Sequence, residues 1–456
     1  MTTALDDRTE LSLGPLARLF AAGRALRSRN YRLFFFGQLI SLVGNWMTQI
    51  ATSWLVYRLT TDPRMLGRVS FAGQFPAFLA APLAGVLVDR WNLRRTLLIT
   101  QVLAMLQSFA LAYFTLSHSH PITIPILLLL YVFQGIINGV DIPARQTIVS
   151  QLVTEPNDIA NAIALNSSQF NLARLIGPAI AGFVIAAVGE GYCFLIDGIS
   201  YIAAIVAIYL IVLSPHPPRR GRKHVLHELR EGLVYTLGFP PLRELLILSA
   251  IVSLFGIPYT VLMPVFAREL LHGGPQTLGL LMGGIGVGAV IGAVLLASRR
   301  TVVGLGRWIV VTGLGFCAAL AIFALSRAVW LSVLMMGFTG LGLVIVNASI
   351  NTLVQTIADE DKRGRALSLL LMCFLGMLPI GGLLFGELAR SDRLGPRATV
   401  ILGVICVAVA IIRFGTRLRK IREHARPVLI RRGVLPAIAQ GLEAQATLSA
   451  PPEQSA

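Results

Sequence analysis

Three charged residues stand alone inside long apolar stretches of the sequence: Asp141, Arg174 and Asp197. A charge at the centre of a bilayer costs at least about 2.5–3.5 kcal/mol, so such a residue usually faces a cavity or a partner. Because burial favours the neutral form of a carboxyl group, Asp141 or Asp197 can bind and release a proton. Arg174 can pair with Asp141 and release it when a ligand or a proton arrives. The alternative for all three is a static role in holding helices together.

Uncharged polar side chains recur at helical spacing in two stretches, from Asn45 to Thr52 and from Asn347 to Gln355. Residues three and four positions apart share one face of a helix. We expect these faces to line a central path, with helix–helix hydrogen bonding as the alternative. The cavity-lining candidates are Asn45, Gln49, Gln134, Asn138, Asn166, Asn347 and Asn351.

Membrane-spanning helices must position these residues. The stretch 33–57, for example, contains no Asp, Glu, Lys or Arg. A hydrocarbon core about 30 Å thick needs roughly 20 such residues in a helix, and backbone groups in lipid must satisfy one another. The sequence therefore predicts an all-α membrane protein with twelve transmembrane helices. We expect them at 33–57, 66–88, 96–117, 122–144, 159–188, 192–213, 244–267, 276–298, 306–326, 328–354, 365–388 and 398–415.

Composition and charge agree with a membrane protein. The mean hydropathy is +0.73 and 13% of residues are charged, against about 25% in soluble domains. The net charge of +17 comes from basic residues in loops and tails beside the spans. Most of them lie on the side that holds both termini and the central loop. The positive-inside rule then predicts a multi-pass protein of the cytoplasmic (inner) membrane with both termini in the cytoplasm.

The two halves of the chain are related. Gln151, Ala162, Gly177 and Gly182 recur as Gln355, Ala366, Gly381 and Gly386, each displaced by 204 residues. Two parallel six-helix halves joined by a cytoplasmic loop are typical of secondary transporters. We expect an N-terminal tail (1–32), a first half (33–213), a central loop with an amphipathic surface helix (214–242), a second half (243–416) and a C-terminal tail (417–456).

The loop after the second span carries a motif. It runs from Gly85 through Asp89 and Arg90 to Arg94 and Arg95, and it resembles the Gly-x-x-x-Asp-Arg-x-Gly-Arg-Arg signature of the major facilitator superfamily. Asn92 stands where glycine is usual and suits a left-handed turn. The resemblance implies a latch on the cytoplasmic face in which Asp89 pairs with Arg94 or Arg145, or faces the positive N-terminus of the eleventh span. The latch candidates are Gly85, Asp89, Arg90, Arg94 and Arg145; the alternative is a plain basic membrane anchor.

The fifth span resembles the antiporter branch of that superfamily. Gly177, Pro178 and Gly182 match its Gly-Pro-x-x-Gly-Gly element, in which proline bends the helix and small residues allow close packing. Gln134-Gly135 fits the Arg-x-x-Gln-Gly element, but Tyr131 occupies the arginine position. That arginine is tied to proton transfer in relatives. Arg174 is a candidate for the missing charge.

The stretches 141–146, 161–166 and 171–174 are similar to the exporter family that contains the enterobactin exporter and the transmembrane secretion effectors. The resemblance implies a proton-driven, alternating-access exporter of an amphipathic siderophore or of a macrolide- or tetracycline-like drug. The expected partners are this small molecule, protons and membrane lipids. Neither nucleic acid nor a cofactor is expected, and a monomer suffices.

Two other functions stay open on the sequence alone. The first is a lysophospholipid transporter, and the second is a non-transporting membrane sensor or scaffold. An enzyme is not expected, because the sequence holds no nucleotide-binding loop, nucleophile elbow, metal pair or carboxylate dyad.

Overall fold

The protein is almost entirely helical in the residues that the computed structural model describes, which are 23–88, 91–153, 155, 158–212, 225–299, 301–390 and 394–431. The first half contains η1 (Arg24–Arg27), α3 (Arg29–Thr60), α4 (Pro63–Val88), α5 (Leu93–Leu116), α6 (Ile124–Leu152), α7 (Ile159–Val188) and α8 (Glu190–Leu210). The second half contains α10 (Pro240–Ile251), η3 (Val252–Gly256), η4 (Pro258–Leu262), α11 (Met263–Val265), η5 (Phe266–Leu270), α12 (Pro275–Ala297), α13 (Leu305–Leu325), α14 (Val329–Ile357), α15 (Arg363–Arg390) and α16 (Gly395–Arg431). Between them lies α9 (Val225–Gly238).

Among the described residues, ten helical units are long and apolar enough to cross a membrane, with Pro240–Leu270 counted as one. The helices α3 and α4, of 32 and 26 residues, match the others in length and pack among them. The twelve predicted spans therefore correspond to α3–α8 and to the units from α10 to α16. The last helix continues to Arg431, beyond the predicted end at residue 415, because its basic extension remains helical.

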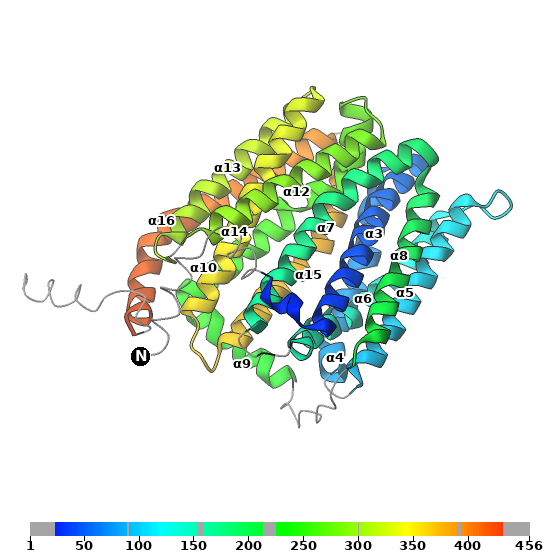
Figure 1. Ribbon diagram of the computed structural model, residues 1–456. Helices are drawn as coiled ribbons and strands as arrows, with labels where there is room; N and C mark the ends of the chain where they lie inside the picture. Colours follow the sequence, from blue (N-terminus) through cyan, green and yellow to red (C-terminus); the bar gives the residue numbers. More distant parts are fainter. Residues whose placement is uncertain are drawn as a thin grey trace, which may run out of the picture.

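The two halves repeat one packing scheme. In the first half α3 packs on α7 and α8, α4 on α6, and α5 on α8. In the second half the unit starting at α10 packs on α15 and α16, α12 on α14, and α13 on α16. The halves meet along α7 with α12 and along α4 with α15, and α7 and α12 run side by side through the centre (Figure 1). The predicted pair of six-helix halves is thereby confirmed.

The duplicated positions have equivalent surroundings. A Cβ atom added to Gly177 would lie 2.5 Å from Cβ of Trp46 on α3, and one added to Gly381 would lie 2.5 Å from Cγ of Pro258 in η4. Each glycine thus lets the fifth helix of its half approach the first. Two tyrosines 204 positions apart bond to the main chain near the fifth helix of each half: the Tyr31 hydroxyl donates to the Ala162 carbonyl of α7 at 2.8 Å, and the Tyr235 hydroxyl of α9 accepts from the Asp359 amide before α15 at 3.0 Å.

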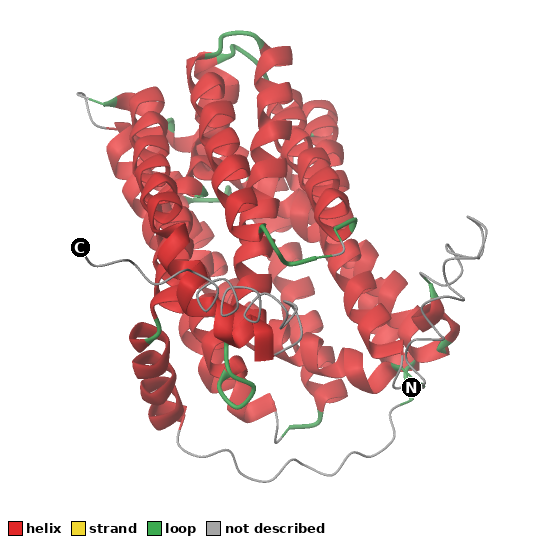
Figure 2. Cartoon of the chain, turned by 90° about the vertical axis from the view of Figure 1, so that its left-hand side faces the viewer, coloured by secondary structure: helices red, strands yellow, loops and turns green. Residues whose placement is uncertain are grey.

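The helix α9 defines one end of the bundle. It forms within the predicted central loop and contacts α15, where Glu231 pairs with Arg365 at 2.7 Å. We call this the α9 end, and we call the opposite end, with the connections at residues 61–62, 117–123 and 271–274, the far end. The long helices run between these ends (Figure 2). That α9 lies on a membrane surface stays a prediction.

The seventh span is not the continuous helix that we expected. It begins as α10, passes through the π-helical η3, the 3₁₀-helical η4 and the short α11, and ends as the π-helical η5. Pro258 and Pro264 each lack the amide hydrogen that a continuous α-helix needs, and Gly256 precedes the first of them. Such irregular backbone is tolerated at membrane depth where it is buried in protein or lines a cavity.

Candidate functional site

Polar contacts join the two halves at the far end. The Tyr57 hydroxyl at the end of α3 donates to the Glu269 carboxylate in η5. Arg68 on α4 lies 3.5 Å from the Glu387 carboxylate on α15. Within the described parts of the chain, these are the hydrogen bond and the ion pair that link the halves. We call these four residues the far-end clasp.

Close backbone packing continues from the far end to the middle of the bundle. A Cβ atom on Gly182 would lie 2.8 Å from the Pro275 carbonyl of α12, and one on Gly386 would lie 2.9 Å from the Pro63 carbonyl at the start of α4. Toward the middle, Gly286 faces Leu175 in the same way. The Gly177-Pro178-Gly182 element therefore serves two contacts, with Gly177 against α3 and Gly182 against the other half.

Asp141 on α6 is fully engaged within the first half. Its carboxylate pairs with Arg145 one turn later and accepts hydrogen bonds from Thr100 at 2.7 Å and Gln101 at 2.8 Å. The proposed pairing of Asp141 with Arg174 is therefore wrong. Arg145 shares a helix face with Asp141 and reaches it directly, at a spacing where opposite charges attract.

Asp197 on α8 is buried among hydroxyl groups from three helices. Its Oδ2 atom accepts hydrogen bonds from Thr48 of α3 at 2.9 Å and from Ser108 of α5 at 2.7 Å. Its Oδ1 atom is buried and has no hydrogen-bond partner among the described residues. That oxygen faces Gly44, where an added Cβ atom would lie 2.7 Å away. No Lys, Arg or His within the described chain forms an ion pair with this carboxylate, which is 1% exposed.

Arg174 lies in the middle of α7, at the surface where the halves meet. Its Nη2 atom donates to the Asn171 side chain at 3.0 Å, and its Nε atom is buried without a partner in the described chain. Across the interface, Tyr259 of η4 interacts electrostatically with it. Tyr259 is fully buried, and its hydroxyl has no partner among the described residues either.

The cavity-lining candidates fall into three groups. Asn45 donates to the Tyr201 hydroxyl at 3.3 Å and Thr48 contacts Asp197, so both make the helix–helix hydrogen bonds that were the alternative interpretation. Gln49 is exposed and Asn166 is half-buried. The remaining candidates bond along their own helices, Gln134 to Asn138 at 3.2 Å, Asn347 to the Leu343 carbonyl at 3.1 Å and Gln355 to Asn351 at 2.6 Å.

The latch lies partly outside the described residues, because these exclude Asp89 and Arg90, and of Gly85 the structure describes only its place in α4. Arg94 donates to the carbonyls of Ile208 and Tyr209 near the end of α8. Its guanidinium also lies over the aromatic ring of Tyr209. A cation there complements the helix C-terminus. Asn92 is not left-handed but extended, and its side chain accepts from the Arg95 amide at 3.1 Å as the N-cap of α5.

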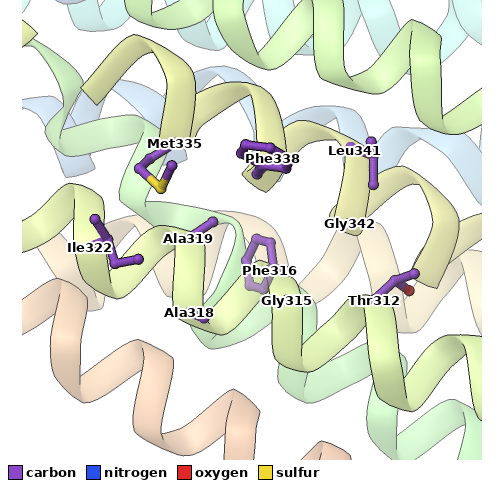
Figure 3. Close-up of a pocket in the computed structure, with 10 residues that line it drawn as sticks. All are labelled: Thr312, Gly315, Phe316, Ala318, Ala319, Ile322, Met335, Phe338, Leu341 and Gly342. Carbon is purple, nitrogen blue, oxygen red and sulfur yellow. The ribbon is translucent and has the colours of Figure 1, made fainter. Parts of the chain in front are cut away.

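A small apolar pocket of about 260 Å³ opens between α13 and α14. Phe316, Phe338 and Met335 line it, and Thr312 supplies the hydroxyl among its lining residues (Figure 3). It lies within the second half and includes no residue of α7 or of the interrupted seventh span. We therefore do not place the transported molecule there.

Sequence reasoning missed the far-end clasp. Most basic residues beside the spans lie at the end that holds the termini, whereas Arg68 lies at the far end. A basic residue at this end was the available signal in the sequence. Tyr57 and Glu269 are 212 positions apart, so their contact depends on how the halves dock.

Comparison with known proteins places these features in a family. A family profile described as transmembrane secretion effector matches residues 21–435. The chain is 26% identical to the staphyloferrin A transporter of Staphylococcus aureus over 84% of this chain and 94% of that protein. It is 24% identical to the multidrug efflux pump Tap of Mycolicibacterium fortuitum over 87% and 98% of the two chains. Its fold is similar to that of the nucleoside transporter NupG, with a TM-score of 0.63 at 16% identity over 86% of this chain and 99% of that one.

Proposed function

Because the chain belongs to the transmembrane secretion effector family of the major facilitator superfamily, we propose that this membrane transporter exports an amphipathic small molecule by proton antiport. The substrate class is a siderophore or a macrolide- or tetracycline-like drug. Relatives named as a staphyloferrin A transporter and a multidrug efflux pump support this class. Both align over most of their length.

The observation that carries the mechanism is the uneven contact between the halves. The described polar links between them, Tyr57 with Glu269 and Arg68 with Glu387, both lie at the far end. In alternating access, one half rocks against the other around a central site, and one end is closed at a time. This arrangement is what we expect when the path is closed at the far end. The transporter then takes up its substrate from the α9 end.

The excess of basic residues at the α9 end supports a cytoplasmic location for that end. Both termini then lie in the cytoplasm, and the far end faces outward across the inner membrane. Substrate enters from the cytoplasm and leaves when the far-end clasp opens. A monomer contains the complete path.

We assign the transported proton to Asp197 in preference to Asp141. The Asp141 carboxylate already has Arg145 as its counter-ion. Among the described residues, Asp197 has only hydroxyl groups as donors, and its Oδ1 atom has no partner there. A carboxylate charge inside the membrane without a counter-ion is expensive, and binding a proton removes that cost.

Proton flux in everted vesicles with an acid interior tests this proposal. Staphyloferrin A, a macrolide, a tetracycline and lysophosphatidylcholine are added singly while a dye reports the interior pH. We expect one of the first three to dissipate the gradient with wild type and with Glu423→Gln, an exposed control on α16, but not with Asp197→Asn. If the vesicles take up a compound without losing the proton gradient, the proposal of proton antiport is wrong. A response to the lysolipid alone would favour lysophospholipid transport.

A further inference from the structure

The middle of α7 holds a cation for which the described chain supplies no anion. The Arg174 guanidinium bonds to Asn171 at 3.0 Å, and its Nε atom is buried without a partner. The four buried carboxylates of the described residues are engaged elsewhere. Asp141 pairs with Arg145 and Asp197 accepts from hydroxyl groups. Glu190 pairs with Arg58, and Glu244 pairs with Arg413 and Arg417. An ionisable residue retained inside a membrane at such a cost marks a functional site with an expected partner of opposite charge.

The second half presents a polar group to the same place. Tyr259 is fully buried, its hydroxyl has no described partner, and it interacts electrostatically with Arg174. It belongs to η4, where the seventh span is neither α-helical nor continuous. Interrupted helices near the bilayer midplane form substrate sites in many transporters, and π-helical turns are frequent at functional sites.

An aromatic surface adjoins the guanidinium. Phe170 lies one turn before Arg174 on α7, and residues four apart share a helix face. Its ring is 47% exposed and meets Trp46 of α3 edge to face, with 5.6 Å between the ring centroids. A compound held by Arg174 therefore has an apolar wall on which to place its hydrophobic part.

We propose that Arg174, Asn171 and Tyr259 bind an anionic group of the transported compound, while Phe170 and Trp46 hold its apolar part. The substrate is then an amphipathic anion, such as an aromatic carboxylate or sulfonate. A guanidinium binds such groups with charge-assisted and often bidentate hydrogen bonds. This inference rests on the proposed transport function, because it names the chemistry of the same substrate. The anion would contact both halves, since Arg174 belongs to the first and Tyr259 to the second.

A matched pair of fluorescent probes tests the charge requirement. 1-Anilinonaphthalene-8-sulfonate and N-phenyl-1-naphthylamine share one aromatic body and differ by a sulfonate that stays ionised throughout the usable pH range. Each is titrated into the full-length protein in lipid nanodiscs, with empty nanodiscs subtracted. The variants are Arg174→Gln, Arg174→Lys and Tyr259→Phe. Arg419→Gln, on the exposed part of α16, removes a positive charge outside the site, and thermal unfolding checks that each variant is folded.

We expect Arg174→Gln to weaken binding of the anion at least tenfold and binding of the neutral probe less than twofold. Arg174→Lys should bind the anionic probe more tightly than Arg174→Gln does, but less tightly than wild type. Tyr259→Phe should weaken binding of the anionic probe several-fold. Arg419→Gln should change the affinity for neither probe. Equal effects on both probes, or no protein-dependent binding of the anion to wild type, would overturn the anion site. Binding needs no proton gradient, so a protein that binds the anion but exports nothing would reject the transport proposal alone.

Discussion

The Tyr57 hydroxyl donates a hydrogen bond to the Glu269 carboxylate, and this contact ties the end of α3 to the end of the interrupted seventh span. Tyr57 is 1% exposed whereas Glu269 is exposed, so the bond is shielded from water on the Tyr57 side. The other link of the far-end clasp, Arg68 with Glu387, is about half exposed on both sides. The two links therefore differ in how much they can stabilise the closed far end.

Tyr57→Phe should open the far end more than Arg68→Ala does. A hydrogen bond to a charged group contributes about 1.5–3 kcal/mol, and about 1.4 kcal/mol is a factor of ten in an equilibrium. An exposed ion pair contributes about 0.2–1 kcal/mol. We expect Tyr57→Phe to shift the equilibrium between the closed and the open far end toward the open form roughly tenfold or more. We expect Arg68→Ala to shift the same equilibrium by less than about fivefold. Spin labels at His118→Cys and Arg327→Cys, in a background without the native cysteines, measure the distance between the halves.

The ion pair within the first half predicts a change in stability rather than in coupling. Asp141→Asn leaves the Arg145 charge without its buried partner, and breaking such a pair costs about 3–5 kcal/mol. We expect a lower midpoint of thermal unfolding in detergent for Asp141→Asn, and a partial recovery in the double variant Asp141→Asn/Arg145→Gln. A fully stable Asp141→Asn protein that has lost proton coupling would instead make Asp141 the coupling residue.

Acid should not release the far end through Asp62, which lies between α3 and α4. Burial would raise the pKa of Asp62, but hydrogen bonds from Arg64 (3.0 Å from its amide, 3.1 Å from Nη2) and its charge outweigh this and lower the pKa. A lowered pKa means that the stabilisation is present above the ordinary carboxyl value of about 4 and is lost as the pH falls through the lowered one. The distance between spin labels at positions 118 and 327 should therefore stay the same from pH 8 to pH 5. It is measured in the Asp197→Asn variant, so that the proposed protonation of Asp197 does not contribute. A widening above pH 5 would contradict this assignment.

Local patterns predicted the helices, whereas docking of distant segments decided the site. Charge-free runs located most span ends within a few residues, since the bilayer sets the length of a span. The exceptions are α6, which continues beyond the predicted end at residue 144 to Leu152, and α16, which continues beyond residue 415 to Arg431. Asp141 and Arg145 are four residues apart on one helix, a spacing at which opposite charges pair. This spacing predicts their ion pair better than the pairing of Asp141 with the more distant Arg174. Thr48, Ser108 and Asp197 come from three helices, and nothing in their sequence spacing brings them together. Pro258 and Pro264 signalled the broken seventh span, but apolarity alone made it look continuous.

Replacing the duplicated glycines by alanine should have two different effects: separation of the halves, or strain within one half. Gly182 and Gly386 face the opposite half, and an added Cβ atom would lie 2.8 Å from the Pro275 carbonyl or 2.9 Å from the Pro63 carbonyl. Backbone atoms cannot yield as a flexible side chain does, so Gly182→Ala and Gly386→Ala should push the halves apart at the far end. Gly177 and Gly381 face helices of their own half, so alanine there should strain one half without separating it from the other.

We therefore expect Gly182→Ala and Gly386→Ala to lengthen the distance between labels at positions 118 and 327. Gly177→Ala and Gly381→Ala should leave that distance unchanged and lower the midpoint of thermal unfolding, because crowding a packed interface usually costs about 1–3 kcal/mol. Each within-half variant is the matched control for a between-half variant on the same helix. If all four variants lengthened the distance equally, the far end would not be held by close contact of α7 with α12 and of α4 with α15.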